Sequence, residues 1–436
     1  NHVACFIVHV FTLGVWRHLL ARHGQLGHAT LLFRRVEWRL LAGIEYLDYM
    51  LFNSLEFLIF LPIVFAGYWL LARHLKLQNL FVVVVSYVFY GWWDWRFLIL
   101  IAFTSLWSFV FGLLELKGEA RSFPSKVRLA LSCAINLGIL GYFKYCDFFV
   151  DQAVAVLRCF GFDPQVCALN VVLPVGISFY TFQALSYTID VYRRTITPTR
   201  DPTAFFAFIS FFPQLVAGPI ERATNLLPQF ERRRVFDYKQ GVEGCYQILW
   251  GLFKKVVVAD NCALYVDQVF STYGSQSAST LLLAAVFFSF QIYGDFAGYS
   301  LIAIGVARVL GFRLMENFHR PYFATSIGEF WHRWHISLST WFKDYLYIPL
   351  GGSRRGLPRQ IVNLAIVWLV TGLDDGLREI KRTFAALEPV IGDRKRRARL
   401  LRHRLHEVAL LLRVGVERVE ADDRLDARAA DDVDVR

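Results

Sequence analysis

Apolar stretches recur along most of the chain and are separated by short polar connections. Many come close to the length of about 20 residues that an α-helix needs to cross a bilayer. The pattern predicts helices at residues 55–72, 79–93, 97–114, 127–145, 171–189, 203–220, 241–259, 278–293, 296–312, 336–350 and 360–373. Several of these segments are too short or too polar to cross alone, so we expect about eight to ten crossings.

Helix-breaking residues interrupt two of these segments. They are Pro174 and Gly176 in the first, and Pro213, Gly218 and Pro219 in the second. Broken helices are tolerated at membrane depth only where protein or a water-filled cavity covers the freed backbone groups. The amphipathic residues 147–160 are predicted to lie on the surface or to re-enter the membrane. The sequence therefore predicts an all-α polytopic integral membrane protein, with broken and re-entrant helices around an internal tunnel.

The two ends of the chain differ in character from the middle. Residues 1–49 hold one apolar run and then a stretch dense in His, Arg and Leu, and we interpret them as a non-native or upstream extension. Residues 374–436 are rich in Arg, Asp, Ala and Val, and their one aromatic residue is Phe384. This end is either a charged cytosolic tail with a helix near residues 394–420, or sequence translated out of frame.

Composition favours a membrane protein and argues against other classes. Charged residues make up 19% of the chain and hydrophobic residues 56%, whereas soluble chains carry about 25% charged residues. The net charge is +11, but the basic residues fall mainly in connections between apolar spans. This placement predicts a lipid bilayer as partner and no nucleic acid. The seven cysteines are odd in number and form no Cys-x-x-Cys pair, which argues against disulfides and a metal site.

The densest polar cluster of the apolar region lies at residues 330–345. It contains His332, Arg333, His335 and Asp344 among three tryptophans. Ionisable groups at membrane depth are expensive and by default mark a functional site, and a histidine can accept a proton from a hydroxyl. The alternative is an interfacial belt, where Trp and Arg lie at the headgroups and histidine only satisfies a hydrogen bond. The residue types leave both interpretations open.

Further charged residues lie within or beside apolar segments. Asp295 is placed to orient a histidine or a substrate hydroxyl, and the alternative is a bond to a broken helix end. The pair Glu221 and Arg222 follows a helix break. Lys254 and Lys255 are interpreted as side chains that extend their ammonium groups to the membrane interface.

Four long motifs follow one another along the chain. They are Leu-Pro-Val-Gly-Ile-Ser-Phe-Tyr-Thr-Phe-Gln at 173–183 with Tyr-Thr-Ile-Asp-Val-Tyr at 187–192, Phe-Pro-Gln-Leu-Val-Ala-Gly-Pro-Ile-Glu-Arg at 212–222, Gln-Ile-Tyr-Gly-Asp-Phe-Ala-Gly-Tyr-Ser at 291–300, and Phe-Trp-His-Arg-Trp-His-Ile-Ser-Leu-Ser at 330–339 with Asp-Tyr-Leu-Tyr-Ile-Pro-Leu-Gly-Gly at 344–352. Together they closely resemble the alginate O-acetylase branch of the membrane-bound O-acyltransferases. The resemblance implies a transmembrane domain of that family over residues 50–373, incomplete at its C-terminal end.

This resemblance implies acetyl transfer by a multi-pass protein of the bacterial inner membrane. The donor is expected to be acetyl-CoA, as a substrate and not a bound cofactor. The acceptor is a hydroxyl of an exopolysaccharide such as alginate, reached with periplasmic acetyl-transfer partner proteins. His335, in the family's Arg-Trp-His-Ile-Ser-Leu element, is the implied catalytic residue. His332, Arg333, Asp344 and Asp295 are assigned supporting or substrate-binding roles, and no metal is expected.

One departure from the family pattern bears on activity. The family's second histidine lies in a Trp-His-Gly element on the following apolar helix, whereas this chain has Asp374-Asp375-Gly376 at that place. A frameshift just past Leu373 explains both the missing element and the unusual end of the chain. We therefore expect the chain as written to be inactive or nearly so.

Two other kinds of function stay open. A transporter or flippase for a lipid-linked or sugar substrate would also use broken helices and intramembrane charges, although the two halves of the chain show no internal repeat. An inactive scaffold that assembles partner proteins would fit the missing element. Alginate, another exopolysaccharide and a cell-wall polymer all fit as the acceptor.

Overall fold

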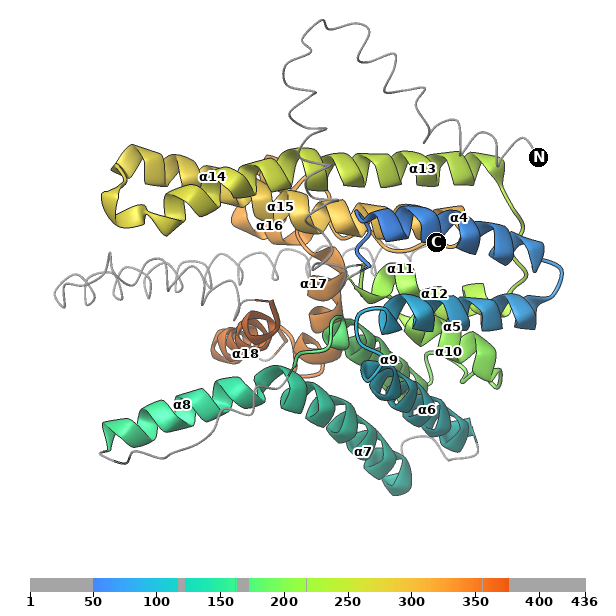
Figure 1. The fold of residues 1–436 in the computed structure, drawn as a ribbon. Coiled ribbons are helices and arrows are strands. Elements are labelled where there is room, and N and C mark those ends of the chain that lie inside the picture. The colour runs from blue at the N-terminus through green and yellow to red at the C-terminus, as the bar shows by residue number, and fades with distance from the viewer. Residues whose placement is uncertain are drawn as a thin grey trace, which may run out of the picture. The chain divides into compact units, whose positions relative to one another are not determined.

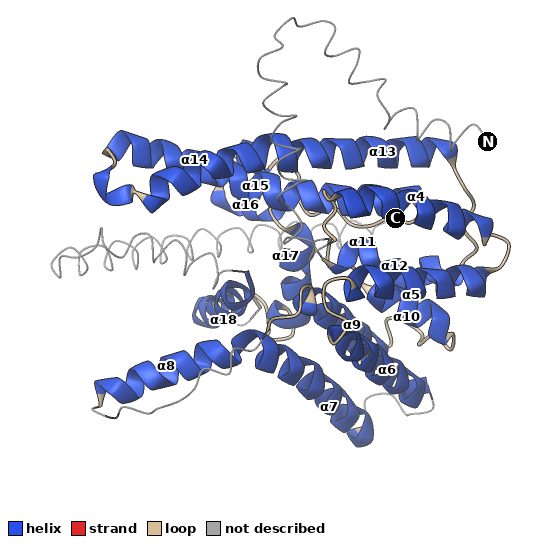
Figure 2. Ribbon diagram, viewed as in Figure 1, coloured by secondary structure: helices blue, strands red, loops and turns tan. Residues whose placement is uncertain are grey.

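A computed structural model describes residues 50–375 except 117–121, 161, 163–171, 217 and 355. Within these residues every regular element is a helix, and the only strand-like pairing is an isolated antiparallel bridge between Phe318 and Trp334 (Figures 1 and 2). The predicted all-α class is therefore confirmed for this part of the chain. The predictions for residues 1–49 and 376–436 lie outside the described residues.

The helices of the first half are α4 (Leu55–Leu70), α5 (Leu75–Gly91), α6 (Phe97–Leu116), α7 (Phe123–Leu140), η2 (Gly141–Tyr145), α8 (Cys146–Cys159), α9 (Ile177–Arg193), α10 (Pro202–Ser210), α11 (Phe212–Leu215) and α12 (Ala223–Glu231). Most of them overlap the predicted apolar segments, whereas α12 lies in none of these segments and the segment predicted at 203–220 forms two helices, α10 and α11. The amphipathic segment predicted at 147–160 is α8, which continues from α7 through the π-helical turn η2.

The second half carries the longest helix and the residues predicted to be functional. Its elements are α13 (Tyr238–Leu252), η3 (Phe253–Ala259), α14 (Asp260–Ser271), η4 (Tyr273–Ser275), α15 (Ala278–Val309), η5 (Pro321–Phe323), α16 (Ile327–Arg333), α17 (Ile336–Phe342), η6 (Lys343–Tyr347) and α18 (Leu357–Asp375). The turns η3 and η6 are π-helical.

Three helical stretches are long and apolar enough to cross a membrane: Phe97–Leu116, Phe123–Arg158 and Ala278–Val309. Shorter apolar helices occupy Leu55–Leu70, Leu75–Gly91, Pro202–Leu215 and Leu357–Thr371. The separate spans predicted at 278–293 and 296–312 are wrong, because α15 runs unbroken through both for 32 residues. At about 1.5 Å per residue, α15 is much longer than the roughly 30 Å of a hydrocarbon core.

The predicted helix breaks are confirmed on both sides of the α9–α11 contact. Helix α9 begins only at Ile177, because Gly176 has a left-handed backbone with φ of 74°. A Cβ atom at Gly176 would lie 2.0 Å from the carbonyl oxygen of Leu215, so only glycine fits there. On the other side, α10 ends at Ser210, and Phe211 separates it from the short helix α11.

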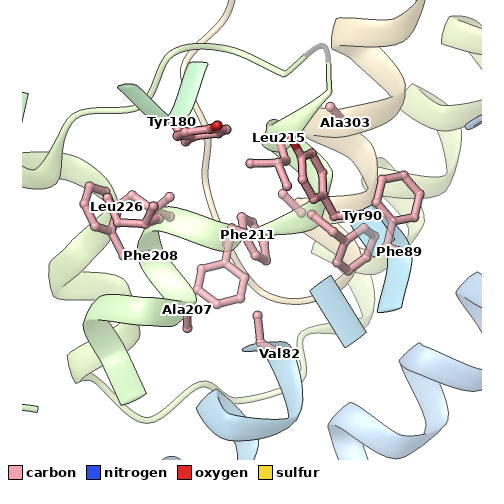
Figure 3. Packing of buried hydrophobic residues seen from close by; sticks show 14 of the residues in the cluster. Val82, Phe89, Tyr90, Tyr180, Ala207, Phe208, Phe211, Leu215, Leu226 and Ala303 are labelled. Carbon is pink, nitrogen blue, oxygen red and sulfur yellow. The ribbon is translucent and has the colours of Figure 1, made fainter. Parts of the chain in front are cut away.

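Aromatic side chains from several helices form the buried centre of the described residues. Phe211 and Phe230 pack on Phe312 at ring distances of 4.7 and 4.6 Å, and Figure 3 shows Phe211 among Phe208, Leu215 and other members of this cluster. Beside them the buried Arg234 guanidinium lies 4.9 Å from the Phe312 ring. It donates to the side-chain oxygens of Gln78 and Asn79, at 2.8 and 2.6 Å. Neutral amides of α5 thus hold this cation in the core.

Glycines bring α13 and α15 into close backbone contact. A Cβ atom added at Gly251 would lie 2.6 Å from the Gly298 carbonyl oxygen, and one at Gly244 would lie 2.7 Å from that of Gly305. Such approach is typical of membrane helices that pair through small residues. Because α15 also carries Asp295 and Phe296, this contact fixes the position of residues near the candidate site.

We expect Gly251→Ala to destabilise the folded protein, because the new methyl group would meet backbone atoms, which cannot move cheaply. The cost should be about 1–3 kcal/mol, measured as a lower temperature at which detergent-purified protein loses its monodisperse size-exclusion peak. The matched control is Gly138→Ala on α7, where an added Cβ meets nothing within 4 Å. Equal melting of the two variants would contradict the expectation.

Candidate active site around His335

His335 occupies a tight turn between α16 and α17. Its backbone is left-handed, with φ of 46° and ψ of 53°, a conformation that is uncommon outside glycine. The turn is held by the segment before η5: the backbone N–H of His319 donates to Arg333 O at 3.0 Å, and that of Ile336 donates to Asn317 O at 2.9 Å. These bonds on either side of the turn fix the backbone position of His335.

Two phenyl rings fix the orientation of the imidazole. The His335 ring packs edge-on against Phe296, with 4.7 Å between ring centroids, and lies nearly parallel to Phe318 at 6.5 Å. Phe296 comes from α15 and Phe318 from the segment after it. The side chain is 4% exposed, so these apolar walls keep bulk water away from the ring.

Ser337 connects the histidine turn to the motif at 212–222. Its hydroxyl donates to Asn317 Oδ1 at 2.5 Å and accepts from the backbone N–H of Ile220 at 3.0 Å. Ser337, Asn317 and Ile220 are all buried. Three segments far apart in sequence therefore meet through one hydroxyl, two residues after His335.

A second polar group lies at the other end of α17 and on η6. Arg222 forms an ion pair with Asp344 at 2.5 Å, and Tyr345 donates its hydroxyl to Asp190 at 2.7 Å. The guanidinium groups of Arg193 and Arg222 lie 5.4 and 5.6 Å from the Tyr345 ring centroid. Asp344 thus binds a cation of the motif at 212–222. The sequence analysis assigns no role to Asp190 or Tyr345, although both lie in the motifs and a carboxylate within a largely buried helix is a signal that indicates a functional site.

Asp295 has a different partner from either one predicted. It forms an ion pair with Lys255 at 2.5 Å, and Lys255 also binds Asp260 at 2.7 Å. The interpretation of Asp295 as a bond to a broken helix end is wrong, because α15 is continuous there. The Lys255 ammonium is held between two carboxylates, and the position of Lys254 and Lys255 at a membrane interface stays a prediction. Asp295 is next in sequence to Phe296, whose ring contacts His335. The supporting role of Asp295 stays a prediction.

His332 and Arg333 lie on α16, before the turn. The Arg333 guanidinium pairs with Glu329 on its own helix at 2.5 Å, and His332 is exposed. The supporting roles of these two residues stay predictions. In the described part of the chain, no three His, Cys, Asp or Glu side chains gather closely enough to hold a metal ion.

Glu221 is a buried carboxyl beside the site. It accepts hydrogen bonds from the backbone N–H of Met315 and, at 2.7 Å, from the Asn225 amide. Burial raises the pKa of the Glu221 carboxyl to about 7, against the smaller opposing effect of these hydrogen bonds. Glu221 thereby links the start of α12 to the segment that carries Asn317.

This pKa predicts a pH dependence of stability. Because the pKa is raised from 4.5 to about 7 on folding, the folded state binds the proton more tightly than the unfolded chain. Stability from this group is therefore complete below pH 4.5 and is lost as the pH rises through about 7, by about 3 kcal/mol. Melting of Glu221→Gln should lose most of the dependence measured between pH 5 and 8. Glu243→Gln, whose carboxylate is half-exposed, is the control, and equal pH slopes for all three proteins would contradict the assignment.

Helix α18 approaches the same region. The ring of Trp368 lies 6.0 Å from that of Trp331 on α16, and Val367 and Val370 pack on the cluster that contains Trp341 of α17. With 3.6 residues per turn, position 374 continues the face of Val367 and Val370, and position 375 that of Trp368. Positions 374 and 375, where the family has Trp and His, therefore lie on the same faces of α18 as the residues that contact α16 and α17.

Comparisons with known proteins agree with the motifs. The sequence profile described as MBOAT, membrane-bound O-acyltransferase family, matches residues 199–373. The probable alginate O-acetylase of Pseudomonas putida is 43% identical over 328 residues, which are 75% of this chain and 67% of that protein. That of Pseudomonas aeruginosa is 41% identical over 75% of this chain and 62% of its own length. The peptidoglycan O-acetyltransferase of Helicobacter pylori is 34% identical over 75% and 67% of the two chains. The chain therefore spans 62% to 67% of these relatives.

Proposed function

Since the chain belongs to the membrane-bound O-acyltransferase family, we propose that it transfers an acetyl group towards a hydroxyl of an exopolysaccharide such as alginate. The donor is acetyl-CoA. The observation that carries this proposal is the buried turn at His335, where the motifs at 212–222 and 330–339 meet through Ile220 and Ser337, with Asn317 as a further partner of Ser337. The names of the relatives support an acetyl group and a polymeric acceptor.

His335 is the proposed general base. Its imidazole takes the proton of the acceptor hydroxyl while the hydroxyl oxygen attacks the thioester carbonyl carbon. Such proton transfer typically contributes about 10²–10⁴-fold to the rate. Phe296 and Phe318 support this role because they hold the ring in one orientation and keep water away.

The setting proposed for this reaction is the bacterial inner membrane, crossed several times around an internal tunnel. Three long apolar helical stretches and four shorter ones supply the crossings, and the breaks before α9 and between α10 and α11 supply irregular backbone that can line a cavity. Periplasmic partner proteins and the polysaccharide complete the proposed assembly. The chain itself is proposed to transfer acetyl slowly, because Asp374 and Asp375 stand where the family has Trp and His.

The test is binding of radiolabelled acetyl-CoA to the purified chain in proteoliposomes, followed by transfer of label to alginate oligosaccharides. Saturable donor binding that unlabelled acetyl-CoA competes away is expected, with slow transfer. Uptake of sugar substrates without donor binding would instead favour a transporter. Assembly of periplasmic proteins without donor binding would favour a scaffold.

A further inference from the structure

Asn317 differs from the other buried asparagines in the described part of the chain. The side-chain amides of Asn79, Asn136 and Asn363 each donate to a backbone carbonyl oxygen, at 2.9, 2.9 and 3.0 Å. Asn317 is 1% exposed, yet its Nδ2 has no acceptor among the described residues. An amide buried without an acceptor destabilises a fold, so it calls for a specific reason.

The orientation of the Asn317 amide follows from its neighbours. The Ile220 N–H donates to the Ser337 hydroxyl oxygen at 3.0 Å, which leaves the hydroxyl hydrogen to donate elsewhere. That hydrogen goes to Asn317, 2.5 Å away, a distance that is typical of an O–H···O bond and short for an N–H···O bond, so the contacting atom is the carbonyl oxygen Oδ1. The amide cannot be flipped without losing this bond, so both Nδ2 hydrogens stay on the side away from Ser337.

The same residue is part of the histidine turn. Its backbone oxygen accepts from Ile336, the residue after His335, and the next side chain, Phe318, is one of the two rings beside the imidazole. Asn317 is thus held by its backbone oxygen and by Oδ1, whereas its Nδ2 has no acceptor within the described residues.

We propose that Asn317 Nδ2 donates a hydrogen bond to the carbonyl oxygen of the acyl donor beside His335, an inference that rests on the proposed acetyl transfer. When the acceptor oxygen bonds to the carbonyl carbon, its proton passes to His335 and the carbonyl oxygen gains negative charge. The C–S bond then breaks as the carbonyl re-forms, and the departing CoA thiolate takes the proton from the imidazolium. A fixed amide donor binds the carbonyl oxygen more strongly in the transition state, where that charge develops, than in the bound donor. Such donors typically contribute about 10²–10³-fold to turnover.

The experiment compares wild type with Asn317→Asp, which keeps an oxygen for the Ser337 hydroxyl and removes both amide hydrogens. The readout is the infrared band of the carbonyl in bound [1-¹³C]acetyl-CoA, so it needs no turnover. The wild-type band should lie at lower frequency, because hydrogen bonding weakens the C=O bond. The preference for acetyl-CoA over CoA in binding should fall roughly three- to tenfold in the variant.

The control is Asn136→Asp, which removes an amide bonded within the fold and should lower the melting temperature without moving the band. Asn317→Ala, which adds no ionisable group, replaces Asn317→Asp if the latter does not fold. Donor binding with an unmoved carbonyl band in the Asn317 variant would overturn the inference while leaving the proposed function intact. Absence of donor binding to wild type would overturn the proposed function, and this inference with it.

Discussion

Replacing Asp374 with Trp and Asp375 with His should raise acetyl transfer by about 10²-fold, the lower end of what a positioned acid–base group contributes. These positions continue the faces of α18 on which Val367, Val370 and Trp368 contact α16 and α17. The helical period therefore places the new histidine on the face of α18 that carries Trp368, whose ring contacts Trp331 of α16. The measurement is transfer of label from acetyl-CoA to alginate oligosaccharides by purified protein of equal melting temperature.

The matched control for this gain is Asp374→Trp combined with Asp375→Gln. It removes the same two carboxylates from the end of an apolar helix but supplies no imidazole. The histidine pair should exceed the glutamine pair by most of the expected factor. Equal rates would show that removal of the two carboxylates, and not acid–base chemistry, causes any gain.

Changing His335 to Asn in the improved background should reduce acetyl transfer by about 10²–10⁴-fold. Asparagine is the informative replacement because it tolerates the left-handed backbone that His335 adopts. The turn between α16 and α17 should therefore persist without the imidazole. Donor binding and melting temperature should change little, since the loss lies in proton transfer.

The control for this loss is His74→Asn, an exposed histidine before α5 and outside the site. Its activity should equal that of the background. A His335→Asn variant that unfolds would indicate that the ring contacts with Phe296 and Phe318 are structural. A folded variant with full activity would remove His335 from the mechanism.

The sequence predicted the helices well where local rules decide them. The apolar segment predicted at 97–114 is α6, and the start of α9 follows from Gly176. It failed at residues 293–296, where Gly294 and Asp295 suggested an end to a span. In the structure Gly294 lies against η3, and Asp295 pairs with a lysine 40 residues earlier in the chain. With these tertiary contacts, the two predicted segments at 278–293 and 296–312 form one continuous helix, α15.

What the sequence determined by itself is the all-helical class, the helix breaks and the family resemblance, because these depend on composition, local geometry and motif order; the choice of His335 also came from the motifs and stays a prediction. Only the tertiary structure decided the partners of Asp295 and Asp344, and the amide of Asn317 beside the histidine turn. The bonds concerned join residues far apart, such as Ile220 with Ser337, 117 positions away, and Asp190 with Tyr345, 155 positions away. Residue types state which groups can pair, but packing of distant helices selects which of them do.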